Sequence, residues 1–286
     1  MPDYPWMLKD LKRCTIKKNN MIKRPIMRYH GGKWRLAPYI ISHFPIHNVY
    51  TEAFGGAGSV LLRKERSYGE IYNDLDGQVV NLFRVMRDRG EELMRLIELT
   101  PFARDEFIES YSTSDDDVEQ ARRTIYRSFS GFGSAAGSGY KTGFRSCSNR
   151  SSTTPTHDWR NYPMGIPALI ERLRGVTIEN KDAGSLLVQH DSISTLHYVD
   201  PPYVHITRDK TKKVKNAYNF EMQDSDHVEL LRVLISLKGM VIVSGYDNEI
   251  YTSILHGWLK IKRDALADGA RKRTEILYIS PNCELG

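Results

Sequence analysis

Long apolar runs and paired cysteines are both missing from this sequence of 286 residues. No stretch approaches the roughly 20 apolar residues that a membrane-spanning helix needs. Three scattered cysteines, Cys14, Cys147 and Cys283, form no CxxC pair, which argues against a disulfide framework and a cysteine zinc site. No apolar segment follows the charged N-terminus, so we expect no secretory signal, and we expect a reducing cytoplasm.

Extremes of composition are absent as well. Hydrophobic residues make up 40% of the chain and charged residues 27%, which excludes collagen-like, low-complexity and wholly disordered proteins. The sequence shows no cluster of metal ligands, so we expect no metal. The length suits one large domain or a domain that carries an insertion.

Positive charge is concentrated in two segments, although the net charge is only +6. Residues 1–28 contain eight Lys/Arg and two Asp/Glu, and residues 121–174 contain nine and two. The remainder of the chain is mildly acidic. Basic segments of this kind suit a polyanion such as nucleic acid. For residues 1–25, which we expect to form a flexible arm, the alternative is a solubilising tail.

An α/β alternation starts near residue 48. The pattern predicts a buried strand over 48–53, a glycine turn at Phe54–Gly58, a helix over 59–66 and a strand over 70–73 that ends at Asp74. This is the opening of a βαβ unit. Further helices are expected over 33–44, 79–89, 91–130, 167–174 and 226–237. Later strands are expected over 176–179, 194–199, 240–244, 258–263 and 274–279, the last two antiparallel.

This order predicts a Rossmann-like, mostly parallel sheet with an inserted, largely helical region. We expect a catalytic domain over 26–84 and 175–286, and a target-recognition insertion over 85–174. Residues 131–165 are rich in Gly, Ser and Arg, and a loop of that length inside a compact domain is usually functional. Ligands of open α/β sheets bind at the carboxyl ends of the strands, where the notable motifs lie.

The glycine turn predicts a ligand held close to the backbone. Glycines after a strand allow a tight turn and close approach, although an ordinary strand-to-helix turn explains this motif equally well. The spacing is not the GxGxxG of dinucleotide sites, so it suits a nucleoside without a pyrophosphate. Asp74 follows the next strand, where a carboxylate can accept hydrogen bonds from ribose hydroxyls.

Asp200–Tyr203 (DPPY) is the most specific motif in the chain. Two prolines fix an extended path directly after a strand. Asp200 and the carbonyl of Pro201 can then both accept hydrogen bonds from one exocyclic amine, and Tyr203 can stack on the ring that bears it. The alternative is a strand that ends in prolines with an exposed tyrosine. The motif favours a planar amino-heterocycle as substrate.

With these motifs in order, the chain resembles the Dam-type (D12 class, group alpha) DNA adenine N6-methyltransferases, in particular bacteriophage-like members, over about residues 26–286. Ala53 stands where this family commonly has proline, and His30 where it has a small residue, for which we expect a packing role. The motifs that carry the resemblance are Arg28–Lys33, Glu52–Gly58, Asn73–Asp76, Asn180–Asp182, Asp200–Tyr203, Ser244–Asp247 and Lys272–Glu275.

The resemblance implies the S-adenosylmethionine-dependent methyltransferase fold and methyl transfer to adenine N6 in DNA. It implies that Asp74 holds the cofactor ribose and that Asp182 meets its adenine ring. The implied cofactor-binding residues are Tyr29, Gly32, Lys33, Glu52, Phe54, Gly56, Gly58, Asp74, Asp182 and Asp200. The implied catalytic residues are Asp200, Pro201, Pro202 and Tyr203.

The expected partner is double-stranded DNA, from which the target base must be flipped out. Basic side chains of the insertion are the candidates for DNA contacts: Arg122, Arg123, Arg127, Lys141 and Arg145. Further contacts are expected from the loop that holds Arg208, Lys210, Lys212, Lys213 and Lys215. The alternatives are a methyltransferase acting on RNA or on cytosine N4, and a catalytically silent DNA-binding homologue.

The family also suggests a setting for the enzyme. We expect a monomer or weak dimer without membrane contact, in the cytoplasm of a bacterial or phage-infected host cell. Restriction–modification and phage self-protection are both compatible roles.

Overall fold

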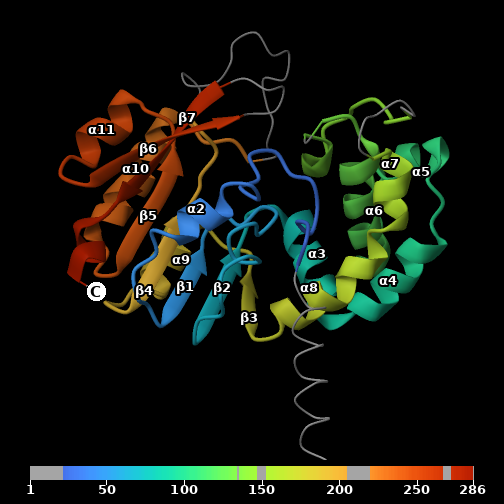
Figure 1. Cartoon of the computed structure of the whole chain (residues 1–286), viewed down its shortest axis with the longest axis horizontal. Coiled ribbons are helices and arrows are strands. Elements are labelled where there is room, and N and C mark those ends of the chain that lie inside the picture. Colours follow the sequence, from blue (N-terminus) through green and yellow to red (C-terminus); the bar gives the residue numbers. More distant parts are fainter. Residues whose placement is uncertain (1–21, 134, 147–152, 205–219, 267–271, 286) are drawn as a thin grey trace, which may run out of the picture.

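A computed structural model describes residues 22–133, 135–146, 153–204, 220–266 and 272–285. The predicted basic arm lies almost entirely outside these residues, as does the predicted basic loop from Arg208 to Lys215. The described chain forms one seven-stranded sheet in the order β3-β2-β1-β4-β5-β7-β6, with helices on both faces (Figure 1).

Five strands run parallel, as predicted, and the two late strands are antiparallel. β1 lies at the centre of the parallel part, between β2 and β4. The strands are β1 (Val49–Glu52), β2 (Gly69–Asn73), β3 (Val176–Glu179), β4 (Thr195–Val199), β5 (Met240–Gly245), β6 (Leu259–Leu266) and β7 (Lys272–Ile279).

The central strands are buried on both faces. Every residue of β4 and β5 is buried, as expected for parallel strands covered by helices on each side. Adjacent residues of a strand point to opposite faces, so Tyr198 and Val199 enter two different hydrophobic clusters. Ile242 and Val243 of β5 divide in the same way.

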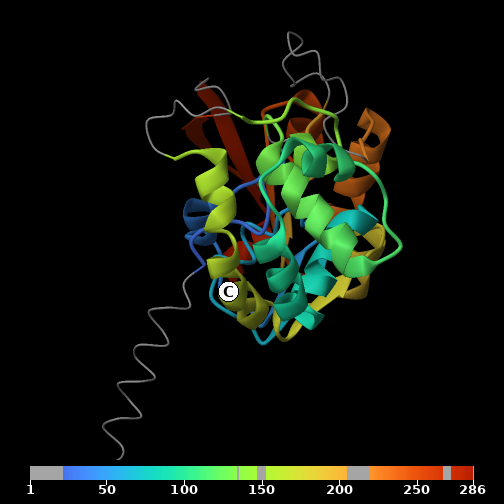
Figure 2. The same cartoon turned by 90° about the vertical axis from the view of Figure 1, so that its right-hand side faces the viewer.

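Most of the helices lie beyond the β3 edge of the sheet. They form the green-to-yellow bundle that faces the viewer in Figure 2. These helices are α3 (Gly77–Asp88), α4 (Gly90–Leu99), α5 (Arg104–Glu109), α6 (Asp117–Ser130), α7 (Pro155–Arg160) and α8 (Ile166–Leu173). The proposed domain boundaries at 84/85 and 174/175 stay a prediction. No helix in the described part of the chain has the length and apolarity to cross a membrane.

The other helices are associated with the sheet itself. α9 (Ala183–Gln189), α10 (Asp224–Ser236) and α11 (Glu249–Ile254) share one hydrophobic cluster, and α2 (Ala37–Ile41) contributes to the other. α7, α9 and α11 were not predicted, and α7 lies in the segment 131–165 that was expected to be a loop. Helices of six or seven residues are too short for a clear apolar period. α2 covers only the middle of the helix expected over 33–44.

The predicted helix over 59–66 is wrong. This stretch is a run of turns in the structure. The buried carboxylate of Glu52 accepts the Leu61 N–H at 2.7 Å, so that N–H does not bond to a carbonyl of its own segment. The N–H groups of Arg63 and Lys64 both bond to the Val60 carbonyl, which mixes three- and four-residue spacing. A side chain from the neighbouring strand therefore overrides local helix propensity.

Candidate active site

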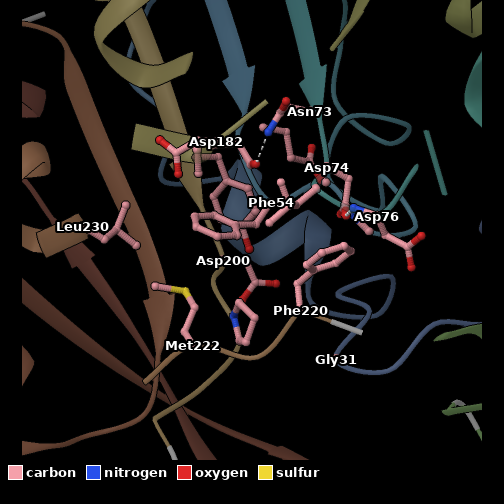
Figure 3. Close-up of a pocket in the computed structure, with 18 of the residues that line it drawn as sticks. Gly31, Phe54, Asn73, Asp74, Asp76, Asp182, Asp200, Phe220, Met222 and Leu230 are labelled. Carbon is pink, nitrogen blue, oxygen red and sulfur yellow. Dashed lines mark hydrogen bonds between the residues drawn. The ribbon is translucent and has the colours of Figure 1, made fainter. Parts of the chain in front are cut away.

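A cavity of about 750 Å³ lies at the carboxyl ends of the parallel strands (Figure 3). It is the edge at which the sequence predicted a ligand. All predicted cofactor residues line it except Gly58, which packs against the ring of Phe83. Asp200 and Pro202 of the DPPY motif also line it, so the structure brings the two predicted sets of residues together.

The glycine turn forms one wall of the cavity and leaves no room for side chains. A Cβ at Gly55 would lie 2.1 Å from Cε2 of Tyr72, and one at Gly56 would lie 2.9 Å from the ring of Tyr29. Gly56 also has a φ of +48°, a conformation that favours glycine. The Tyr72 hydroxyl donates to the Gly56 carbonyl at 2.6 Å. Tyr72 thus supports the turn on the side away from the cavity, and the backbone of the turn faces the cavity.

Gly55→Ala is expected to destabilise the fold by about 1–3 kcal/mol, the usual cost of overpacking. Tyr72 is fully buried and stacks on Phe83 at 3.9 Å between ring centroids, so its ring has little freedom to move aside. Urea unfolding measures the change. Gly165→Ala is the matched control, because a Cβ there meets nothing within 4 Å and φ is −89°. Equal stability of the two variants would contradict the steric argument.

Asp74 closes the turn after β2. Its two carboxylate oxygens accept the Gly56 N–H at 2.7 Å and the Asp76 N–H at 2.8 Å. Burial raises the pKa of Asp74 to about 6, against the opposing effect of these hydrogen bonds. Each carboxylate oxygen has a second acceptor site. Asp74 can therefore also accept a hydrogen bond from a hydroxyl group of a ligand in the cavity.

Asn73 joins the glycine turn to the loop that carries Asp182. Its amide nitrogen donates to the carbonyls of Ala53 and Lys181 at 2.9 and 3.0 Å, and its oxygen accepts the Lys181 N–H at 2.9 Å. Asp182 caps α9 by accepting the Ser185 N–H at 2.8 Å. The sequence indicated Asn73 only as part of a motif. In the structure its side chain links the loop that carries Asp182 to the glycine turn that Asp74 binds.

One wall of the cavity is apolar and was not predicted from the sequence. Phe220 and Met222 precede α10, and Leu230 and Val233 lie on that helix. In Figure 3, Met222 and Leu230 lie on the opposite side of the cavity from Asp74 and Asp76. An apolar helix face is typical of an ordinary core, so no signal in the sequence distinguished these residues. Together with Phe54 they offer surfaces for a flat ring.

Glu52, at the end of β1, is the most deeply buried acid of the cavity wall. One of its oxygens accepts both the Tyr50 hydroxyl at 2.9 Å and the Leu61 N–H at 2.7 Å. Burial raises its pKa to about 8. Its hydrogen bonds to the protein indicate that it shapes the turn, whatever contact it makes with a ligand.

Asp200 has two differently used oxygens. Its Oδ2 lies 2.8 Å from the Nζ of Lys33, which also donates to the Gly31 carbonyl at 3.0 Å. Its Oδ1 is buried and accepts no hydrogen bond from the residues that the structure describes. Burial raises the pKa of Asp200 to about 6, although Lys33 acts in the opposite direction. Lys33 therefore ties the N-terminal motif to the DPPY motif and leaves one acceptor oxygen for another group.

Tyr203 points toward the antiparallel edge of the sheet. Its hydroxyl donates to Oε2 of Glu275 on β7 at 2.9 Å. Its ring centroid lies 4.3 Å from that of Tyr246 and 4.8 Å from the Nζ of Lys33. Tyr246 and Glu275 belong to the last two sequence motifs, for which the sequence predicted no functional role.

The predicted DNA-contacting arginines mostly have partners within the protein. Arg122 is buried, with ion pairs to Glu106 at 2.8 Å and Glu119 at 2.6 Å. The other three are placed similarly: Arg123 pairs with Glu109 and Glu119, Arg127 donates to Ser110 and Gln78, and Arg145 donates to the Phe129 carbonyl. Lys141 is exposed. The DNA contacts stay a prediction, and the structure gives these arginines a role in holding α6 to its neighbours.

Comparison with known proteins identifies the family. The family model of the D12 class N6 adenine-specific DNA methyltransferases matches residues 29–265. The chain belongs to this family. Its membership confirms the predicted fold class and makes the chain an adenine-specific DNA methyltransferase.

Similar proteins from bacteria agree with this assignment. This D12-class chain is 26% identical to the Type II methyltransferase M1.LlaDCHI of Lactococcus lactis subsp. cremoris, over 73% of this chain and 76% of that protein. It is 24% identical to a DNA adenine methylase of Serratia marcescens, over 82% and 86% of the two chains. It is 22% identical to the DNA adenine methylase of Escherichia coli (strain K12), over 92% and 95%.

Proposed function

We propose that this chain transfers the methyl group of S-adenosylmethionine to N6 of an adenine flipped out of duplex DNA at a specific sequence. The observation that carries the proposal is Oδ1 of Asp200, a buried acceptor without a described partner at the edge of the cavity. Its sister oxygen is held by Lys33, so the carboxylate is fixed before a substrate amine arrives.

The cavity fits the proposed cofactor. Its volume lies within the range of about 300–1,000 Å³ that is usual for small-molecule sites. Gly55 and Gly56 present backbone, Asp74 has acceptor capacity for ribose hydroxyls, and Phe54 and Met222 offer apolar surface for a base. The bound cofactor supplies an electrophilic methyl group, and the protein supplies orientation and electrostatics.

The DPPY motif would hold the target adenine. Asp200 Oδ1 and the Pro201 carbonyl would accept the two N6 hydrogens, which favours a tetrahedral nitrogen whose lone pair points at the methyl group. Tyr203 would stack on the base. Fixing the amine in this way turns an encounter between two molecules into a reaction within one complex.

The segment 131–146 carries a further proposed DNA contact. A Cβ at Gly137 would lie 2.3 Å from the Arg28 carbonyl, so this segment packs against the N-terminal motif. On it, Phe132 is 74% exposed, and Tyr140 and Lys141 are also exposed. Exposed rings can stack on bases, and a lysine can neutralise a phosphate. Such contacts would offset the cost of flipping, a few kcal/mol.

Incubation with radiolabelled S-adenosylmethionine and unmethylated duplex DNA, followed by nucleoside analysis, tests the proposal. We expect label in N6-methyladenine. Label in N4-methylcytosine, or in RNA alone, would overturn the proposal. Cofactor binding without any label in nucleic acid would indicate the silent DNA-binding homologue instead.

Lys141→Gln is expected to flatten the salt dependence of DNA binding. If Lys141 neutralises one phosphate, the slope of log K against log salt should fall in magnitude by about 0.9. Fluorescence anisotropy over a salt series measures it. Arg95→Gln on α4 is the control, because it removes the same charge from another exposed site. An equal change in both variants would show a general effect of net charge rather than a contact.

A further inference from the structure

The hydroxyl of Tyr203 is anchored to a distant part of the chain. It donates to Oε2 of Glu275 at 2.9 Å, across 72 positions of sequence. Hydrogen bonds to a carboxylate are stronger than those between neutral groups. We propose that Glu275 is a positioning residue of the methyl transfer: it fixes the ring of Tyr203 and thereby the plane of the target adenine. The inference rests on the proposed function.

The anchor itself is held firmly. β7 lies between β5 and β6, with Gly245 opposite Ile276 and Arg263 opposite Glu275. Glu275 itself pairs with β6, and the three residues that follow it are buried and pair with both β5 and β6, so the backbone next to the carboxylate is fixed by the sheet and by the core. An acceptor on such a strand can define the position of a side chain that arrives from a loop.

Two other neighbours of the ring, Tyr246 and Lys33, do not stack on it in parallel. Tyr246 lies against it at an interplanar angle of 53°, which is tilted rather than stacked. Lys33 lies over the ring and is itself bound to Asp200. The hydroxyl oxygen lies on the axis about which the ring turns, so its hydrogen bond to Glu275 fixes the direction of that axis. Because a phenolic O–H prefers to lie in the plane of its ring, the bond also favours the ring orientation whose plane contains the acceptor. Stacking depends on the plane of the ring, so a tilted ring would carry the base away from Asp200.

Glu275 also acts on Asp200 through charge, and this effect must be separated from positioning. Its negative charge raises the pKa of Asp200, in opposition to Lys33. At pH 8 Asp200, with a pKa of about 6, is already ionised. Rates measured at pH 8 therefore report the position of the ring rather than the protonation of Asp200.

A double-mutant cycle at pH 8 tests the proposal with the full-length chain, S-adenosylmethionine and duplex DNA. Glu275→Ala should lower kcat by roughly 10- to 100-fold, the scale of a misplaced reacting group, with little change in cofactor affinity. Tyr203→Phe keeps the ring and removes the hydroxyl, a group that also lowers the pKa of Asp200. Asp200 is ionised at pH 8, so this variant should lose a similar factor. The double variant should be no slower than the slower single variant, because both changes remove the same bond.

Glu275→Gln provides the rescue, since its amide oxygen still accepts the hydroxyl. It should recover to within about three-fold of the wild-type kcat. Duplex DNA with 2-aminopurine at the target position reports stacking: Glu275→Ala should flip the base but leave it less quenched than the wild type does. Glu249→Ala, on α11, is the control for removing a carboxylate.

Multiplicative losses in the double variant, or an unchanged Glu275→Ala, would overturn the positioning role. In both cases the wild type would still methylate adenine, so the proposed function would stand. A wild type that leaves adenine unmodified would instead refute the proposed function. If Glu275→Ala does not fold, Glu275→Gln and Tyr203→Phe still decide the outcome: a Gln variant as slow as Tyr203→Phe would contradict the anchor.

Discussion

Asp200→Asn is expected to lower the rate of methyl transfer by about a thousand-fold, the upper end for loss of one electrostatic group in an active site. Asparagine has nearly the same shape but no charge, and its amide nitrogen would oppose the N6 amine as donor against donor. The amide oxygen would then face Lys33, which keeps an acceptor but loses the negative charge of its 2.8 Å partner. Single-turnover transfer to duplex DNA measures the loss.

Binding should be much less affected than chemistry in this variant. We expect the affinities for cofactor and DNA to stay within about three-fold, because the glycine turn, Asp74 and Asp182 are unchanged. Asp105→Asn, an exposed position in the first turn of α5, serves as the control for the same chemical change. Turnover by Asp200→Asn near the wild-type rate would remove Asp200 from the proposed mechanism.

Lys33→Met is expected to move the acid limb of the pH profile to higher pH. In the wild type, kcat/KM should fall as the pH drops through about 6, where Asp200 gains a proton and stops accepting the amine. Lys33 is the strongest influence that lowers this pKa against burial. Without the cation the carboxylate protonates at a higher pH. Activity at pH 7 should fall by about two-fold when the limb has moved to pH 7, and by up to roughly ten-fold for each further unit.

The other groups that act on Asp200 remain in that variant. They are Glu52 on β1, Tyr198 on β4, Tyr203, Tyr251 on α11 and Glu275 on β7. None of these side chains carries a positive charge, so none replaces Lys33. Lys33→Arg keeps the charge and should keep the acid limb close to that of the wild type. An acid limb that stays in place in Lys33→Met would show that the ion pair does not control Asp200.

The strand ends could be predicted because their signals are local. A short strand followed by Asp-Pro-Pro-Tyr places a carboxylate at the edge of a sheet, and the structure has a cavity at that edge. The wall from α10 could not be predicted, because Leu230 and Val233 have the spacing of an ordinary core face. Whether such a face meets the protein or a ligand depends on how elements pack, which no local pattern records.

The arginines of α6 illustrate a different limit. Arg122 is four residues after Val118 and three before Ile125, so it shares the side of the helix that these buried residues occupy. Helical spacing therefore places Arg122 on the buried face of α6, whereas a count of charges in the segment takes no account of helix faces. The partners Glu106 and Glu119 explain how the guanidinium is tolerated there. The number of basic residues describes the composition of a segment, whereas the helix face on which each residue lies determines whether DNA can contact it.

The two anchors of the DPPY motif come from opposite ends of the described chain. Lys33 precedes β1, and Glu275 lies on the last strand. A chain still on the ribosome can have made Asp200 and Tyr203 long before it has made Glu275. We therefore expect nascent chains to methylate nearby DNA poorly until β7 has been made and has joined the sheet.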